Sequence, residues 1–236
     1  MSDLAVTATL SRAAGLSLDA YRPDHVAERV RRALDREGAP DDRGLANVIA
    51  RDADARARFR RSVAVSVTGL FRDAGQFDLL ERKLLPELLA SGRRLRVWSA
   101  GCADGSELYS VAVLLQRLGA LDDTFLLGSD LLEENLALAR GGVYEGVTFS
   151  PSVRARLRWE QRDLVREGPA AGKWRLVLCR NVAIYLDARS KRKLHAALAG
   201  SLTHDGVLML GRSERIDDPR ALGLRSVEPH VYRRLG

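Results

Sequence analysis

The chain has 236 residues, 46% of them hydrophobic and 29% charged, a composition typical of a soluble globular protein with a sizeable core. The two cysteines, Cys102 and Cys179, form no CxxC pair and the four histidines are scattered, which predicts a reducing cytoplasmic location without disulfides or metal. The net charge of +7 fits an acidic protein, a nucleic acid or a membrane surface, but no apolar run approaches the roughly 18 residues that would insert into a bilayer.

The first part of the chain is predicted to be helical. Residues 1–15 lack the basic start and unbroken apolar stretch of a signal peptide. Within residues 20–38, four apolar residues recur at helical spacing on one face, Val26, Val30, Ala33 and Leu34. Arg29, Arg32 and Arg36 share another face of that helix. Two more helices are expected, over residues 42–60 and 77–94, with a bend at Pro86 in the second.

The pattern of apolar residues changes after Arg94. Short apolar runs rich in strand formers occupy residues 95–100, 124–130, 174–181 and 206–213. Helical stretches separate them, over residues 107–118, 132–140 and 188–202. This alternation predicts an α/β fold with a mostly parallel, doubly wound sheet, to which residues 226–233 add an antiparallel edge strand. We expect a helical domain over residues 1–85 and a sheet domain over residues 86–236.

The strongest local signal follows the first predicted strand, where Gly101 and Gly105 frame a turn that leads into a helix. Glycines there let the backbone approach a ligand, and the helix N-terminus adds aimed N–H groups. The GxxxG spacing is not the GxGxxG of dinucleotide sites. Asp130 ends the next strand and could accept both hydroxyls of a ribose. The alternative is a tight turn with Asp130 as a helix cap, but the two features together favour an adenosine ligand.

Two further candidates stand at predicted strand ends. Asp163 follows a short strand over residues 159–162 and could accept from an adenine amino group, or could be a solvated loop residue. Arg180 and Asn181 stand at the end of the apolar run over residues 174–181, where polar groups line the ligand crevice of such folds.

Several ordered segments, among them WSAGCADGSELYS, LCRNVAIYLD and GVLMLGRSE, resemble those of the CheR chemotaxis methyltransferases. SVTGLFRDAGQF and LALARGGVY also match, so that the similarity extends from about Leu16 to Arg233. The resemblance implies a small all-α domain followed by a Rossmann-like class I methyltransferase domain. It also implies transfer of a methyl group from S-adenosylmethionine to glutamates of a chemoreceptor or similar signalling protein, with S-adenosylhomocysteine as product.

The resemblance also implies a set of site residues. The cofactor contacts would be Ser66, Thr68, Arg72, Gly101, Gly105, Glu107, Asp130, Asp163, Leu164, Asn181 and Val182. Within this set, Glu107 would hold the methionine ammonium group and Asp130 the ribose. Asp163 and Leu164 would meet the adenine.

This sequence departs from the family at several positions. Ser66 and Asp163 stand where the family has Asn, and Arg212 replaces the His of its GHSE segment. Only 14 residues separate Tyr144 from Trp159, too few for the small β-subdomain with which many members bind a receptor peptide. We therefore expect that subdomain to be missing.

The chemistry that the resemblance implies needs little acid–base help. A glutamate with a pKa of about 4.3 is already an ionised nucleophile at neutral pH. Arg72 and Tyr185 are the candidate catalytic residues, because both can orient a carboxylate by donating hydrogen bonds, and no general base is expected. Without the resemblance, Arg72 would read as an ordinary surface arginine. Arg29, Arg32 and Arg36 could bind an acidic helical segment of the receptor, or could simply be a solvated face.

Three other functions compete with this hypothesis. The nearest is a non-catalytic relative that binds the cofactor or its product and acts in protein interaction. A nucleic-acid methyltransferase is disfavoured, because no stripe of alternating aromatic and basic residues is present and aromatic residues total 6%. An NAD-dependent oxidoreductase is disfavoured by the absence of the dinucleotide fingerprint.

Overall fold

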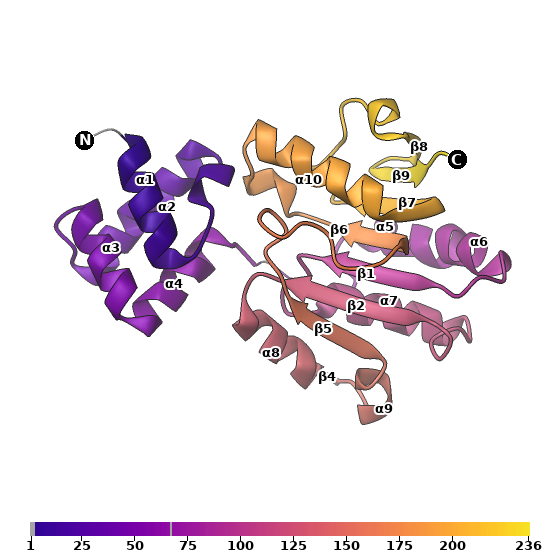
Figure 1. Cartoon of the computed structure of the whole chain (residues 1–236). Coiled ribbons are helices and arrows are strands. Elements are labelled where there is room, and N and C mark those ends of the chain that lie inside the picture. Colours follow the sequence, from indigo (N-terminus) through magenta and orange to yellow (C-terminus); the bar gives the residue numbers. More distant parts are fainter. Residues whose placement is uncertain (1–2, 67) are drawn as a thin grey trace. The chain divides into compact units, whose positions relative to one another are not determined.

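The computed structural model describes residues 3–66 and 68–236. Contacts divide the chain into a helical unit, residues 3–66 with 185–193, and a sheet unit, residues 68–184 with 194–236 (Figure 1). The expected boundary at residue 85 lies later than this division. Residues 77–85 were expected in the helical domain. The apolar side chains from Phe77 to Leu88 instead belong to the core of the sheet unit. The expectation for residues 1–15 includes Met1 and Ser2, which lie outside the described residues.

The helical unit contains four α-helices and a short 3₁₀ turn among its residues up to 66. They are α1 (Asp3–Ala14), η1 (Leu18–Ala20), α2 (Pro23–Glu37), α3 (Asp42–Arg51) and α4 (Ala53–Val63). Helix α2 starts with a proline in its first turn and ends at Gly38, whose φ of 64° is left-handed. The single helix expected over residues 42–60 is wrong. Asp52 leaves the helical conformation and caps α4 by accepting from the N–H groups of Asp54 and Ala55.

The sheet unit is built on seven strands in the order β5-β2-β1-β6-β7-β9-β8. The strands are β1 (Arg96–Ala100), β2 (Phe125–Asp130), β5 (Leu157–Gln161), β6 (Trp174–Cys179), β7 (Leu202–Leu210), β8 (Leu224–Glu228) and β9 (Val231–Arg234). The pairs from β5 to β7 are parallel, whereas β9 runs antiparallel to both of its neighbours. The α/β fold class is thus confirmed. The single antiparallel edge strand expected over residues 226–233 is wrong, because a turn at Pro229 and His230 divides this run into β8 and β9. These two strands pair with each other, with β9 beside β7 and β8 at the edge of the sheet.

Helices cover the sheet on both faces. The helices and short turns that follow residue 68 are α5 (Ala74–Leu79), α6 (Leu85–Ala90), α7 (Ser106–Arg117), α8 (Glu133–Gly141), α9 (Pro151–Arg154), η3 (Ala183–Tyr185), α10 (Ala188–Ser201) and η4 (Arg220–Leu222). Figure 1 shows α10 in front of the sheet and α6 and α7 behind it. Helices α5 and α6 are joined by a π-helical turn, η2 (Leu80–Leu84), which ends two residues before Pro86. A wider turn accommodates a proline, which has no N–H to continue the α-helical ladder.

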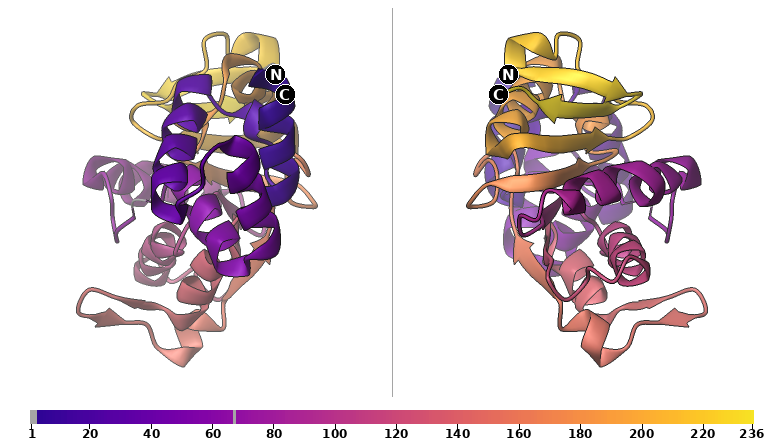
Figure 2. Two further views of the ribbon diagram at one scale, coloured as in Figure 1. Left: turned by 90° about the vertical axis from the view of Figure 1, so that its left-hand side faces the viewer. Right: turned by 90° about the vertical axis from the view of Figure 1, so that its right-hand side faces the viewer.

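Residues 143–148 form a two-strand ribbon, β3 (Val143–Tyr144) with β4 (Val147–Thr148). It lies where the family resemblance in the sequence would place the small β-subdomain. This ribbon projects away from the main sheet in both views of Figure 2. It leaves Val143 and Val147 exposed.

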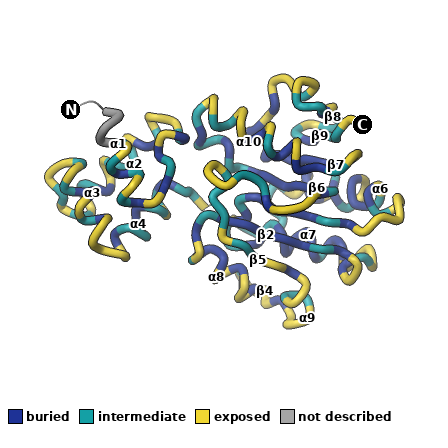
Figure 3. Tube along the Cα trace, in the orientation of Figure 1, coloured by how far each residue is buried: buried dark blue, intermediate teal, exposed yellow. Residues whose placement is uncertain are grey.

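The core of the sheet unit lies along its central strands. Figure 3 shows β1, β2, β6 and β7 as mostly buried segments between exposed loops. Trp98 and Trp174 are fully buried, with ring centroids 5.7 Å apart. Across residues 3–66 and 68–236, no helix has the length and apolar character needed to cross a membrane.

Candidate functional site

The parallel strands bring most of the predicted site residues to one edge of the sheet. Ala100 at the end of β1 pairs with Ser129 of β2, and Cys179 at the end of β6 pairs with Leu210 of β7. The loops that follow these strands begin at Gly101, at Arg180 and at Gly211. Polar groups at the carboxyl edge of an open α/β sheet form its usual ligand site.

The glycine turn after β1 is hydrogen-bonded to the end of β2. Gly101 and Cys102 both donate their N–H groups to Ser129 O, at 2.8 and 2.9 Å. Gly101 and Gly105 have φ values of 76° and 84°, which favour glycine. A Cβ on Gly101 would lie 2.5 Å from Val182, and one on Gly105 would lie 2.6 Å from Trp159. These glycines are therefore required by close packing against protein atoms, in addition to any approach of a ligand.

Asp130 is nearly buried, and burial raises the pKa of its carboxyl group. Its Oδ1 accepts from the Leu132 N–H and the Asn135 side chain, and its Oδ2 accepts from the Ala103 N–H, at 2.9 to 3.0 Å. A carboxylate has about four acceptor positions. The described donors take three, so Asp130 retains capacity for one hydroxyl in this arrangement, whereas the sequence suggested two.

Glu107, in the first turn of α7, belongs to a buried polar network. Its Oε1 accepts from the Ser99 hydroxyl at 2.7 Å, and its Oε2 accepts from Arg180 at 3.0 Å. Arg180 also pairs with Asp73 at 2.8 Å. One guanidinium and two carboxylates leave the group with a net charge of −1. Such a site favours a cation, for example an ammonium group.

The segment around Arg72 is anchored to the glycine turn and to α7. Thr68 donates its hydroxyl to Asp104 Oδ2 at 2.7 Å, and the Phe71 N–H donates to Ser110 at 2.8 Å. Phe71 and Asp73, which flank Arg72, have φ values of 54° and 62°. Left-handed backbone at non-glycine residues is strained and concentrates at functional sites.

Asp163 stabilises its own turn after β5. Its Oδ1 accepts from the N–H groups of Val165 and Arg166, and its N–H donates to Glu167 at 2.9 Å. The neighbouring Arg162 N–H donates to Asp130 O, so the turn lies beside the end of β2. Leu164 is half-buried in this turn.

Asn181 is held by a residue that the sequence did not single out, Glu214. This carboxylate is 1% exposed and accepts from the N–H groups of Asn181, Ala183 and Gly211, at 2.6 to 2.9 Å. It thereby joins the loops after β6 and β7 and holds Asn181 at a φ of 61°. The only signal for it was its place in the GRSE segment.

The remaining predicted residues belong to the helical unit. There Tyr185 lies against His25, with ring centroids 5.1 Å apart, and the Ser66 hydroxyl donates to Ala64 O at 3.4 Å. Arg32 pairs with Glu28 at 2.6 Å and Arg36 with Glu37 at 2.8 Å. The half-buried Arg29 has an Nε without a hydrogen-bond partner among the described residues. The basic face of α2 is therefore partly neutralised by its own carboxylates.

The thiols of the sheet unit do not suit catalysis. Cys102 and Cys179 are buried, and burial raises the pKa of both thiols well above the ordinary value. Both stay protonated at neutral pH, and a thiol reacts as its thiolate.

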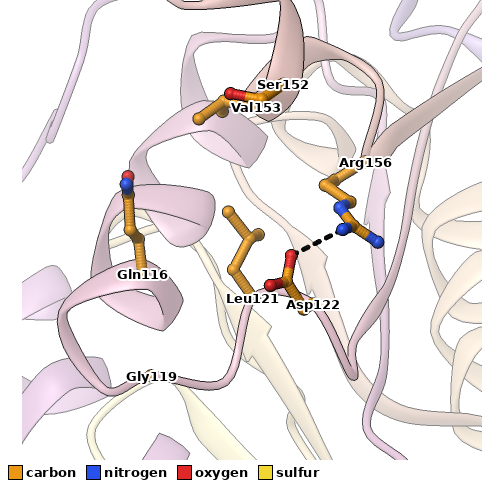
Figure 4. A pocket seen from close by; sticks show the side chains of 7 residues that line it. All are labelled: Gln116, Gly119, Leu121, Asp122, Ser152, Val153 and Arg156. Carbon is orange, nitrogen blue, oxygen red and sulfur yellow. Dashed lines mark ion pairs between the residues drawn. The ribbon is translucent and has the colours of Figure 1, made fainter.

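Two cavities of the sheet unit are lined by residues outside the predicted site set. One of ≈ 370 Å³ lies beside the end of α7, where Asp122 and Arg156 pair at 2.8 Å (Figure 4). No predicted site residue lines it, and Asp122 precedes β2, away from that strand's carboxyl end. The other, of ≈ 360 Å³, is lined in part by Asp73 and Gln76, which both contact Arg180.

The comparisons with known proteins point to one family. The family model described as "CheR methyltransferase, SAM binding domain" matches residues 66–149 and 145–229. A chemotaxis protein methyltransferase of Listeria innocua is 29% identical, over 96% of this chain and 94% of its own. A probable chemotaxis protein methyltransferase of Rhizobium etli is 30% identical, over 86% and 88%. Chemotaxis protein methyltransferase 1 of Pseudomonas aeruginosa is 27% identical, over 89% and 88%.

Proposed function

Because the chain belongs to the CheR methyltransferase family and is an S-adenosylmethionine-dependent methyltransferase, we propose that it methylates glutamate side chains of a chemoreceptor or a similar signalling protein. The observation that carries the proposal is the convergence of Asp130 and the Glu107–Arg180 network at the carboxyl edge of the sheet. Relatives of similar length are named chemotaxis protein methyltransferases, which supports a signalling protein of chemotaxis as the substrate.

The residues at this edge fit the cofactor. The network of Glu107, Asp73 and Arg180 carries one uncompensated negative charge, and the methionine part of S-adenosylmethionine carries an ammonium group. Asp130 retains acceptor capacity for a ribose hydroxyl. We assign to the adenosine part the residues that follow the ends of β5 and β6, the strands on either side of β1 and β2. They are Asp163, Leu164, Asn181 and Val182.

The reaction requires orientation more than proton transfer. Bound S-adenosylmethionine supplies a methyl group on a sulfonium, which needs no further activation. The acceptor glutamate, with a pKa of about 4.3, is ionised at neutral pH and requires no base. We assign to Arg72 the role of holding this carboxylate with its fork of donors, and to Tyr185 a single hydroxyl donor. Fixed orientation of the reacting groups accelerates such a transfer.

The acceptor that we propose is an acidic helical segment of the receptor. The basic face of α2 supports this choice, although Glu28 and Glu37 already pair with Arg32 and Arg36. Reversing the charge of Arg29, Arg32 and Arg36 together is expected to raise KM for the receptor and to leave the affinity for S-adenosylhomocysteine unchanged. An equal loss of both would contradict docking on α2.

Methyl transfer from labelled S-adenosylmethionine to cytoplasmic receptor fragments from the same genome tests the function. The expected label is released from the fragment as methanol in alkali, because esters are hydrolysed whereas methylated amines are stable. Fragments with their surface glutamates changed to glutamine are the matched control. Alkali-stable label would contradict glutamate methylation. Binding of S-adenosylhomocysteine with no transfer to any fragment would instead favour a non-catalytic module.

A further inference from the structure

We infer that Arg180 is a positioning residue, which sets the direction of the Glu107 carboxylate and holds the Arg72 segment beside it. This inference rests on the proposed function, because it takes Glu107 to bind the cofactor's ammonium group and Arg72 to bind the acceptor. It assigns to one buried cation the relative placement of the two reactants.

Arg180 uses all three of its guanidinium nitrogens. Its Nε donates to Gln76 Oε1 at 2.8 Å, its Nη1 to Glu107 Oε2 at 3.0 Å, and its Nη2 to Arg72 O at 2.7 Å. The Nη2 also donates to Asp73 Oδ2 at 2.8 Å. Only 3% of the side chain is exposed, and Phe77 packs its ring 5.2 Å from the guanidinium carbon. A planar guanidinium with fixed donors fixes the relative positions of its acceptors.

Glu107 depends on this cation for its orientation. Arg180 is its ion-pair partner among the described residues, and the Ser99 hydroxyl binds the other carboxylate oxygen. One neutral hydrogen bond would leave the carboxylate free to rotate. Two bonds, one on each oxygen, hold it in one plane.

The Arg72 segment depends on the same cation. Phe71 and Asp73 adopt left-handed backbone on either side of Arg72, which is unfavourable for residues with a Cβ. Arg180 binds both the Arg72 carbonyl and the Asp73 carboxylate, and so stabilises this strained conformation. The residue that orients Glu107 therefore also fixes the backbone from which the Arg72 side chain extends.

Positioning can be separated from charge neutralisation. Without a cation at position 180, the network would carry a charge of −2 and attract an ammonium group more strongly. Arg180→Lys keeps the charge but cannot reach four acceptors, because an ammonium lacks the planar fork. If the role is positioning, this variant should bind the amino-acid part of the cofactor less tightly.

Calorimetric titration with two ligands provides the test. S-adenosylhomocysteine carries the amino-acid group, and 5′-methylthioadenosine has the same nucleoside and thioether without it. Arg180→Lys is expected to weaken binding of the first about tenfold and to change the second less than about twofold. In a Glu107→Gln background, Arg180→Lys should have no further effect on the first. Arg175→Lys, at the other end of β6, is the matched control and should leave both affinities unchanged.

Equal weakening of both ligands, or of neither, would overturn the inference. If Arg180→Lys does not fold, Gln76→Ala removes one acceptor of the cation and should give a smaller loss for S-adenosylhomocysteine alone. Equal losses in that variant would count against the inference in the same way. A wild-type protein that binds S-adenosylhomocysteine but transfers no methyl group would contradict the proposed function, while the ligand ratio of the variant still tests Arg180.

Discussion

Gly105 shows that one additional atom, a Cβ, would not fit at the start of α7. It has left-handed backbone at the start of α7, and the place of a Cβ is occupied by Trp159 and Ala139. The sequence pattern predicted a glycine at this point because it would let the backbone approach a ligand. The contacts indicate that neighbouring protein atoms impose the same requirement.

Gly105→Ala should lower the free energy of unfolding by roughly 2–5 kcal/mol, from left-handed backbone plus overpacking. Gly119→Ala is the matched control, because Gly119 has a φ of 66° but open space around its Cβ position. It should cost only about 1 kcal/mol. Urea denaturation of the two variants measures the difference, and equal losses would refute the packing argument.

Arg72 and Tyr185 are expected to act on the acceptor. Arg72→Ala should lower kcat/KM for the receptor roughly 100-fold, and Tyr185→Phe roughly tenfold, since hydrogen bonds to a charged group are worth about 1.5–3 kcal/mol. Arg72→Lys should be intermediate, because it keeps the charge without the fork. Steady-state methyl transfer supplies the measurement. Full activity in Arg72→Ala would rule out its assignment.

At the scale of elements, an ion pair joins α2 to α4 in the helical unit. Glu37 at the end of α2 pairs with Arg58 of α4 and with Arg36, and its side chain is 8% exposed. Hydrogen bonds from Arg58 and then Arg36 lower the pKa of Glu37 to about 2. Because the folded pKa lies below the unfolded one, the stabilisation is complete above about pH 4.5 and is lost as the pH falls through about 2.

Glu37→Gln should therefore lower the free energy of unfolding by about 1–2 kcal/mol at pH 7, a value reduced by the solvent exposure of both arginines. The difference from wild type should shrink at pH 3. Glu28→Gln, whose partners Arg31 and Arg32 are more exposed, is the control and should have a smaller effect. Urea denaturation at the two pH values distinguishes these outcomes. A constant difference for Glu37→Gln would contradict the linkage.

Several elements of the sheet unit were predictable because apolar runs and turn residues mark them directly. The expected strand over residues 124–130 matches β2, and the expected helix over residues 107–118 matches α7. The break at Asp52 was missed because the helical apolar pattern continues on both sides of it, from Ile49 to Phe59. A side-chain cap can end one helix and start the next without interrupting that pattern.

At the scale of the whole molecule, contacts between residues far apart in the chain could not be predicted from the sequence. Strand ends are readable, so the edge that carries Gly101 and Asp130 could be proposed in advance. The partners of Arg180 could not, because Glu107 and Gln76 lie 73 and 104 residues away in the chain and meet it only in the folded sheet unit. The boundary was set too late for a similar reason, since only packing shows that Phe77 and Leu80 belong to the sheet core.

The claim on which the rest depends is that the carboxyl edge of the sheet binds the cofactor through Asp130. Calorimetric titration of wild type and Asp130→Ala with S-adenosylhomocysteine tests it most directly, with folding of both checked by circular dichroism. We predict saturable binding by the wild type with one site per chain. We predict at least about tenfold weaker binding by the variant, since a lost hydrogen bond to a charged group costs about 1.5–3 kcal/mol. No binding by the wild type, or undiminished binding by a folded Asp130→Ala, would contradict the account.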